Sequence, residues 1–218
     1  MRPETTLFYD VDTQRDFLLP GGSLHIAGSE RIIPALAAMT TLARRFQIRI
    51  FATTDSHRSG DLELERNGGA YPDHCMSGTP GQLKIDETAP LDPLFVLARQ
   101  LRPDELAAAV AHRGELVIEK QAFDAFAGNS NTAAILRELL RDRPDVVIYG
   151  VYTEVCVNDA IRGLRALGCR IHLVADATAD IGADGPGYRE RWAAEGVDLT
   201  TVAEVMRALA AGAAGAAV

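Results

Sequence analysis

Short apolar runs alternate along the whole chain with longer segments in which apolar residues recur every three or four positions. Runs that are apolar on successive positions are typical of strands buried on both faces of a sheet. They fall at 6–11, 46–54, 115–119, 145–151, 170–176 and 197–202. Helical periodicity occupies 31–46, 131–142, 156–168, 187–196 and 202–211. This alternation predicts an α/β fold, namely a three-layer, doubly wound, mostly parallel sheet of about six strands with helices on both faces.

Polar and glycine residues mark several of the expected element boundaries. Asn131 is a suitable N-cap for the helix that follows it. Gly168 suits the position just after a helix end. The alanine- and glycine-rich tail, 210–218, is expected to fray.

One segment, 78–114, interrupts the regular alternation. It is too long for an ordinary α/β loop, and its pattern predicts two short helices at 92–101 and 103–112. No linker divides the chain, so we expect a single domain over 1–218 with a helical insertion around 78–114. Its apolar positions need burial, either at the mouth of the chain's own pocket or against a neighbouring subunit, and we favour a role in assembly that also narrows the site.

Composition narrows the classes of function. The chain has 218 residues, of which 47% are hydrophobic and 24% charged, and a net charge of −8. No basic patch is visible, so a small-molecule partner is favoured over nucleic acid. No apolar run is long enough to span a bilayer, and the amino terminus does not resemble a signal peptide. Three cysteines, an odd number, then favour free thiols in a reducing, cytoplasmic compartment.

Reactive side chains follow four of the predicted strands. Asp12 follows the first strand, Asp55 and His57 the second, Lys120 the third, and Cys156 the fourth after a short bend. The carboxyl ends of parallel strands meet at one edge of a sheet, which is where ligands bind in open α/β folds. We therefore expect these groups to converge on one site.

Each of these residues also has a structural explanation when taken alone. A strand-end aspartate such as Asp12 is commonly a turn former, and a lysine such as Lys120 commonly reaches solvent. A free cysteine is commonly a small core residue, which is how we interpret Cys169. Cys156 stands at a predicted helix start, where the helix dipole favours the thiolate and lowers the thiol pKa. Cys75 stays open as an alternative nucleophile or ligand.

Asp55, His57 and His74 form a possible metal-binding set. Two imidazoles and one carboxylate are ligands for a divalent transition metal with open positions, such as zinc, iron or manganese. The spacing alone is weak support, because an Asp-X-His pair occurs by chance and loop histidines are usually solvated.

Four motifs in this order resemble the isochorismatase-like cysteine hydrolases, and most closely the nicotinamidases, over nearly the whole chain. They are DVDTQRDF at 10–17, ATTDSHRSGDLELERNGGAYPDHC at 52–75, VIEK at 117–120 and GVYTEVCV at 150–157. The resemblance implies that Asp12 and Lys120 are catalytic and that Cys156 is the nucleophile.

The same resemblance implies further roles around the nucleophile. Asp55, His57 and His74 would hold one divalent metal ion, with zinc the first expectation and iron or manganese the alternatives. The family has a cis peptide bond that maps to the bond before Tyr152. It would aim the backbone amides of Tyr152 and Cys156 at a developing oxyanion.

The resemblance also implies an activity and a kind of pocket. It indicates a cysteine-dependent amidohydrolase that releases ammonia from a small amide such as nicotinamide through a thioester, commonly as a homo-oligomer. Phe17, Tyr71 and Phe123 are candidates for an aromatic wall, although each also suits a core position. Ser56 and Tyr71 stand where nicotinamidases often carry tryptophan, and the stretch after Lys120 is short. The chemistry therefore transfers better than the substrate.

Other functions stay open at this point. The substrate could be another small amide, such as maleamate or a ureido or carbamoyl compound, and a catalytically silent relative would keep the same fold. An enol-ether hydrolase of the isochorismatase type lacks the nucleophilic cysteine, so Cys156 counts against it. A dinucleotide-dependent oxidoreductase would need a G-x-G-x-x-G turn after the first strand, where this chain has DVDTQRDF.

Overall fold

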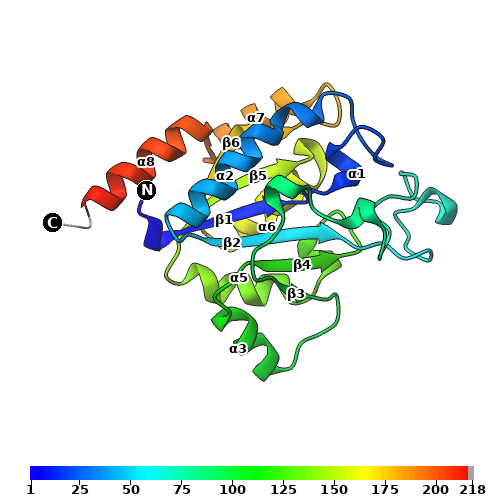
Figure 1. Cartoon of the computed structure of the whole chain (residues 1–218), viewed down its shortest axis with the longest axis horizontal. Helices are drawn as coiled ribbons and strands as arrows, with labels where there is room; N and C mark the ends of the chain where they lie inside the picture. The colour runs from blue at the N-terminus through cyan, green and yellow to red at the C-terminus, as the bar shows by residue number, and fades with distance from the viewer. Residues whose placement is uncertain (216–218) are drawn as a thin grey trace.

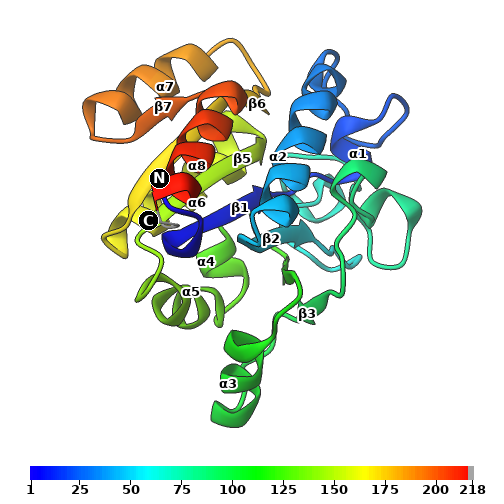
Figure 2. The ribbon, with the colours of Figure 1, turned by 60° about the vertical axis from the view of Figure 1, so that its left-hand side comes forward.

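The computed structural model describes residues 1–215, which form a seven-stranded sheet between two layers of helices (Figures 1 and 2). The strands lie in the order β3-β4-β2-β1-β5-β6-β7, and every neighbouring pair is parallel. Their bounds are Thr6–Val11 (β1), Arg49–Asp55 (β2), Leu94–Val96 (β3), Leu116–Lys120 (β4), Asp145–Val151 (β5), Arg170–Ala179 (β6) and Asp198–Thr200 (β7).

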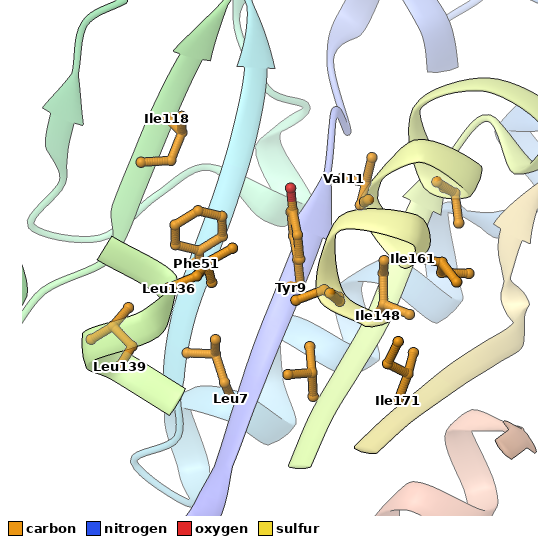
Figure 3. Packing of buried hydrophobic residues seen from close by; sticks show 14 of the residues in the cluster. Leu7, Tyr9, Val11, Phe51, Ile118, Leu136, Leu139, Ile148, Ile161 and Ile171 are labelled. Carbon is orange, nitrogen blue, oxygen red and sulfur yellow. The ribbon is translucent and has the colours of Figure 1, made fainter. Parts of the chain in front are cut away.

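Helices cover both faces because successive side chains of the inner strands point to opposite sides. Phe8 and Ile50 lie on the face covered by α1 (Arg15–Leu18), α2 (Ile33–Arg45) and α8 (Val202–Gly215). Leu7, Tyr9 and Phe51 lie on the other face, which is shown in Figure 3. That face is covered by α3 (Pro103–Ala111), α4 (Ala125–Gly128), α5 (Thr132–Leu140), α6 (Asn158–Ala166) and α7 (Gly185–Ala194).

Short helical turns fill several connections. They are 3₁₀ turns at Pro3–Thr5, Ser29–Ile32, Glu65–Asn67, Pro80–Gln82 and Asp86–Thr88, and a π-helical turn at Thr153–Val157. The π-helical turn joins β5 to α6 and contains Cys156.

The centre of the sheet is the point at which the direction of winding reverses. Strand β1 pairs with β2 on one side and with β5 on the other. The connections that leave such a pair diverge, so a crevice forms outside the carboxyl ends of these strands. Asp12 follows β1, Asp55 ends β2 and Lys120 ends β4, so all three lie at this end of the sheet.

The predicted fold class is confirmed, but the sheet has a seventh strand that the apolar pattern did not predict. The helix prediction for 92–101 is wrong, because Leu94–Val96 forms β3 beside β4. Burial alternates there, with Val96 buried and Phe95 49% exposed, as in a strand. Pairing with the backbone of β4, which would otherwise be an open edge, outweighs local helical preference.

The second predicted helix of this segment is present as α3, which packs against α5 rather than near the carboxyl ends of the strands (Figure 2). Six apolar side chains of this segment pack on the chain's own core, namely Leu94, Val96, Leu101, Leu106, Ala109 and Val110. Leu91, Phe95 and Leu97 remain exposed, so the expected role of the segment in assembly stays a prediction.

The boundary signals had mixed outcomes. Gly168 follows α6 with a left-handed φ of 76°, as predicted. Asn131 occupies the N-cap position of α5, but its side chain makes no capping bond. Instead it accepts from the amide of Leu101 at 3.0 Å and donates to the carbonyl of Arg99 at 2.7 Å, which ties the loop after β3 to α5.

The alanine- and glycine-rich tail, 210–218, is described only as far as residue 215. Residues 210–215 continue helix α8 instead of fraying, and 216–218 lie outside the described residues. Across residues 1–215 no helix combines the length and the apolar character needed to cross a membrane.

Candidate active site

A buried lysine stands at the centre of the strand ends. Lys120 is fully buried, and its Nζ lies 3.0 Å from Asp12 Oδ2 and 3.6 Å from Cys156 Sγ. The same Nζ donates a hydrogen bond to the Asp55 carboxylate. Oxygens of Asp12 and Asp55 and the sulfur of Cys156 all lie within 4.8 Å of one another. One ammonium group therefore links two carboxylates and a thiol in a buried site.

Burial decides the charge states in this cluster. Burial alone opposes a charge on Lys120, but the carboxylates of Asp12 and Asp55 raise its pKa well above the ordinary value, so the ammonium persists. Burial also raises the pKa of the Asp12 carboxyl, with Lys120 acting in the opposite direction.

The expected activation of the thiol by a helix start is wrong. Burial raises the pKa of Cys156 well above the ordinary thiol value, and Lys120 lowers it only in part while Asp12 and Asp55 raise it further. Cys156 lies in the π-helical turn before α6 begins at Asn158, and two carboxylates face it. A thiol with a raised pKa needs a base to form the thiolate, and an oxygen of Asp12 lies within 4.8 Å of the sulfur.

Two polar residues that the sequence reasoning missed hold the Asp12 loop in place. The Gln14 amide donates to the Asp55 carbonyl at 2.8 Å and accepts from the Asp55 amide at 2.7 Å. Lys84 is buried and pairs with Asp10 at 3.1 Å, beneath the same loop. Lys84 belongs to the first part of the 78–114 segment, so that part of the segment stabilises the loop that contains Asp12.

The predicted metal ligands Asp55, His57 and His74 come together and are all buried. His57 Nδ1 lies 3.1 Å from the Asp61 carboxylate, and His74 Nδ1 lies 2.7 Å from the Pro72 carbonyl. These acceptors place the proton on Nδ1 of each ring, so both Nε2 atoms keep a free lone pair. Burial also lowers the pKa of His74, which keeps it neutral.

Glu63 is a further residue that the sequence reasoning missed. Its Oε2 lies 3.4 Å from His57 Nε2, and within the described residues both buried atoms lack a hydrogen-bond partner. Burial raises the pKa of Glu63 to about 7, with Asp55 adding to the effect. Unpartnered nitrogen and oxygen donors in a buried cluster fit a divalent cation. The carboxylates within LELE could have suggested Glu63, but only the fold places it against His57.

A narrow pocket opens onto Cys156 and this possible metal site. Its cavity measures about 20 Å³. Its walls are mainly apolar and aromatic: Phe17, Leu24, Asp55, Tyr71, His74, Phe123, Val151, Tyr152, Val155, Cys156 and Ile181. The three aromatic residues expected at the wall are therefore present, and the rings of Tyr71 and Phe123 meet edge to face at 5.4 Å.

The turn that contains Cys156 is tied to two neighbouring loops. The Tyr152 hydroxyl donates to the Phe17 carbonyl at 2.6 Å, and the Val151–Tyr152 peptide bond is cis, as the resemblance implies. The Glu154 carboxylate accepts from the amides of Ile181 at 2.9 Å and Gly182 at 3.1 Å. Glu154 thereby fixes the loop after β6, which contributes Ile181 to the pocket wall.

The other two cysteines lie away from this pocket. Cys75 is buried, and its amide donates to the Asp16 carboxylate at 2.6 Å. Cys169 lies just before β6, at the amino end of that strand, and packs against the core, as expected. Of the three thiols, Cys156 is the one that lines the pocket.

Known amide hydrolases are similar to this chain. It is 28% identical over 182 residues to the nicotinamidase/pyrazinamidase of Mycobacterium tuberculosis, covering 80% of this chain and 86% of that protein. It is 27% identical over 229 residues to the ureidoacrylate amidohydrolase RutB of Azorhizobium caulinodans, covering 95% and 91%. The structure of the Pyrococcus horikoshii pyrazinamidase in complex with zinc matches with a TM-score of 0.70 and 27% identity, covering 90% of this chain and 99% of that one.

Fold, site and relatives together define the class of protein as a hydrolase of amide carbon–nitrogen bonds. The family model described as Isochorismatase domain matches residues 7–204, so the chain belongs to the isochorismatase family. The resemblance drawn from the four motifs is thereby confirmed.

Proposed function

We propose that the protein hydrolyses a small, uncharged aromatic amide such as nicotinamide, and that it releases ammonia through a thioester on Cys156. The observation that carries this proposal is a buried thiol, ammonium and carboxylate at the base of a narrow aromatic pocket. The similarity to a nicotinamidase/pyrazinamidase supports the same substrate class.

The pocket lining favours a neutral ring over a substrate with a carboxylate. Its cavity of about 20 Å³ is far smaller than the roughly 300–1,000 Å³ of sites for drug-sized ligands, so only a small substrate would fit. In the described part of the chain no arginine or lysine lines it, and Lys120 beneath it already pairs with Asp12 and Asp55. A carboxylate such as that of ureidoacrylate would lose its hydration there without gaining an arginine or lysine partner, which leaves a metal ion as its one source of positive charge.

In the first half of the reaction, Asp12 takes the proton from the Cys156 thiol and Lys120 stabilises the thiolate that forms. The thiolate attacks the amide carbonyl, and the backbone amides of Tyr152 and Cys156 donate hydrogen bonds to the oxyanion of the tetrahedral adduct. When the adduct collapses, the carbon–nitrogen bond breaks and Asp12 gives its proton to the leaving amine. Ammonia departs and an acyl thioester remains on Cys156.

In the second half, water attacks the thioester carbonyl while Asp12 accepts a proton from it. The same two amides hold the second oxyanion, and collapse breaks the carbon–sulfur bond. The carboxylic acid leaves and Asp12 returns its proton to Cys156. One water is consumed for each ammonia and acid released.

We also propose that Asp55, His57 and His74, with Glu63 beside them, hold one divalent metal ion. Zinc is the first expectation, as in the Pyrococcus horikoshii structure, and iron or manganese suit the same donors. When bound, such an ion supplies Lewis acidity and a fixed contact for an electron-pair donor of the substrate. Asp61 keeps His57 in the tautomer that a metal ligand needs.

An ammonia-release screen over nicotinamide, pyrazinamide, maleamate and ureidoacrylate tests the function. We expect turnover of the two aromatic amides, complete loss in Cys156→Ala and full retention in Cys169→Ala. Turnover restricted to the two carboxylate substrates would refute the argument from the pocket. If Cys75→Ala were inactive and Cys156→Ala active, Cys156 would not be the nucleophile. Absence of turnover with every compound would indicate a catalytically silent relative.

A further inference from the structure

A second hollow lies at the end of the sheet opposite to the candidate active site. It measures about 520 Å³, which is within the range of small-molecule sites. Its lining comes from the segments that precede β2, β4 and β5. Arg49 and Asp55 are the first and last residues of β2, so the two sites are separated by roughly 20 Å of strand. A ligand in this hollow would therefore be different from the amide substrate.

Four arginines line this hollow, and three of them, from three separate segments, form no ion pair within the described residues. Arg49 begins β2, Arg113 lies before β4 and Arg143 lies before β5. Among residues 1–215 none of the three has a carboxylate within ion-pair distance, although Asp92 and Glu115 also line the hollow. Glu115 is already paired with the fourth arginine, Arg44.

Arg49 is the least satisfied member of this arginine cluster. One of its terminal nitrogens donates to the Ala109 carbonyl at 3.2 Å, but its buried Nε has no partner in the part of the chain that the structure describes. Burial, together with the positive charges of Arg143 and Arg113, lowers the pKa of Arg49 to about 10. Each positive charge therefore disfavours the charged state of the neighbouring guanidinium groups. This positive cluster occurs in a chain whose net charge is −8.

Asp92 and Glu115 supply two negative charges against the four arginines of the lining, so an excess of positive charge remains that a bound anion would relieve. Arginine presents planar, bidentate donors that match phosphate oxygens, and a tetrahedral phosphate accepts from several directions at once. A monocarboxylate would balance only one of the three guanidinium groups. We propose that Arg49, Arg113 and Arg143 form a binding site for a small phosphate-bearing anion.

Isothermal titration of the purified chain with pyrophosphate, at ionic strength matched with sodium chloride, tests this site. We expect saturable binding that the double variant Arg113→Gln/Arg143→Gln weakens by about tenfold or more, because charged hydrogen bonds are lost. The control Arg162→Gln/Arg207→Gln removes the same charge from exposed positions and should bind as the wild type does. Orthophosphate and adenosine monophosphate distinguish a bare phosphate group from a phosphate-bearing metabolite.

Thermal unfolding in anion-free buffer gives an independent readout. If the arginines repel one another, Arg113→Gln/Arg143→Gln should melt at the same temperature as the wild type or higher. A lower melting temperature would mark them as structural residues and overturn the proposal. Pyrophosphate binding that is equal in the double variant, or absent from the wild type once ionic strength is matched, would overturn it as well.

Discussion

Replacing Lys120 by methionine tests the electrostatic account of the site, because methionine keeps the length and apolar stem of lysine but removes the ammonium. The 3.0 Å separation between Lys120 Nζ and Asp12 corresponds to an attraction of about 5.5 kcal/mol at an effective dielectric constant of about 20. Breaking a buried pair by removing one partner typically costs about 3–5 kcal/mol. For a chain of this size that range lowers the Tm by roughly 6–20 °C.

A double-mutant cycle makes the prediction sharper. In the wild type, Asp12→Asn should destabilise the fold, because Lys120 loses one of its two carboxylates. In the Lys120→Met background the same change should stabilise the fold, because it removes one of two carboxylates that repel each other without a cation. The sign of the Asp12→Asn effect is therefore expected to reverse.

Urea unfolding in the presence of a chelator measures this cycle, so that a metal ion near Asp55 does not contribute. Trp192 is the single tryptophan and is 2% exposed, so its fluorescence reports the loss of packing directly. Lys84→Met is the matched comparison, because Lys84 is also buried and pairs with Asp10, whereas Lys120 is the lysine that contacts the sulfur of Cys156. The reasoning fails if Lys120→Met lies within about 1 kcal/mol of the wild type, or if Asp12→Asn has the same effect in both backgrounds.

Three further predictions concern the metal, the pocket wall and pH. Elemental analysis should find about one divalent ion per chain, lost in His57→Ala and retained in His112→Ala; equal metal content in both variants would exclude the proposed site. Glu154→Gln should release the loop after β6 and raise KM for nicotinamide more than it lowers kcat; a change in kcat alone would contradict a positioning role. Burial opposes the charge on Asp180, but two hydrogen bonds from Arg189 lower its pKa below the unfolded value. The stability it contributes is therefore present above the unfolded pKa and lost as pH falls through the folded pKa. Asp180→Asn should cost about 1–2 kcal/mol at pH 7 and almost nothing near pH 2, measured by urea unfolding.

Most of the fold was predictable because parallel strands buried on both faces leave an unmistakable apolar run. Strand β1 packs Phe8 against one helical layer and Leu7 and Tyr9 against the other, so it is apolar from Leu7 to Tyr9. Strand β3 was not predicted because it has only three residues and one buried side chain, Val96, at its end. Its conformation follows from pairing with β4, which is a property of the assembled sheet.

The candidate site also contains residues that could be placed from the sequence and residues that could not. Residues at strand ends could be placed from the sequence, because the topology of a doubly wound sheet brings those ends together. Glu63 and Gln14 could not be placed so easily, because the contacts of Glu63 with His57 and of Gln14 with Asp55 join residues on different segments. The thiol pKa of Cys156 was predicted in the wrong direction, since a helix start is a local feature whereas burial and facing carboxylates are not.

The small number of lysines in the composition points to both lysines of the site, whereas the VIEK motif points to Lys120 alone. The chain has only two lysines among its 22 basic residues, at 84 and 120, and arginine supplies every other permanent cation. Both are buried, and each pairs with an aspartate near the end of β1, Lys84 with Asp10 and Lys120 with Asp12. A compact ammonium fits between close carboxylates where a planar guanidinium would not. The two differ in what else they face: Lys84 contacts the Thr13 hydroxyl beneath the loop, whereas Lys120 also reaches the sulfur of Cys156. The first therefore holds the loop, and only the second can stabilise a charge that develops in the pocket.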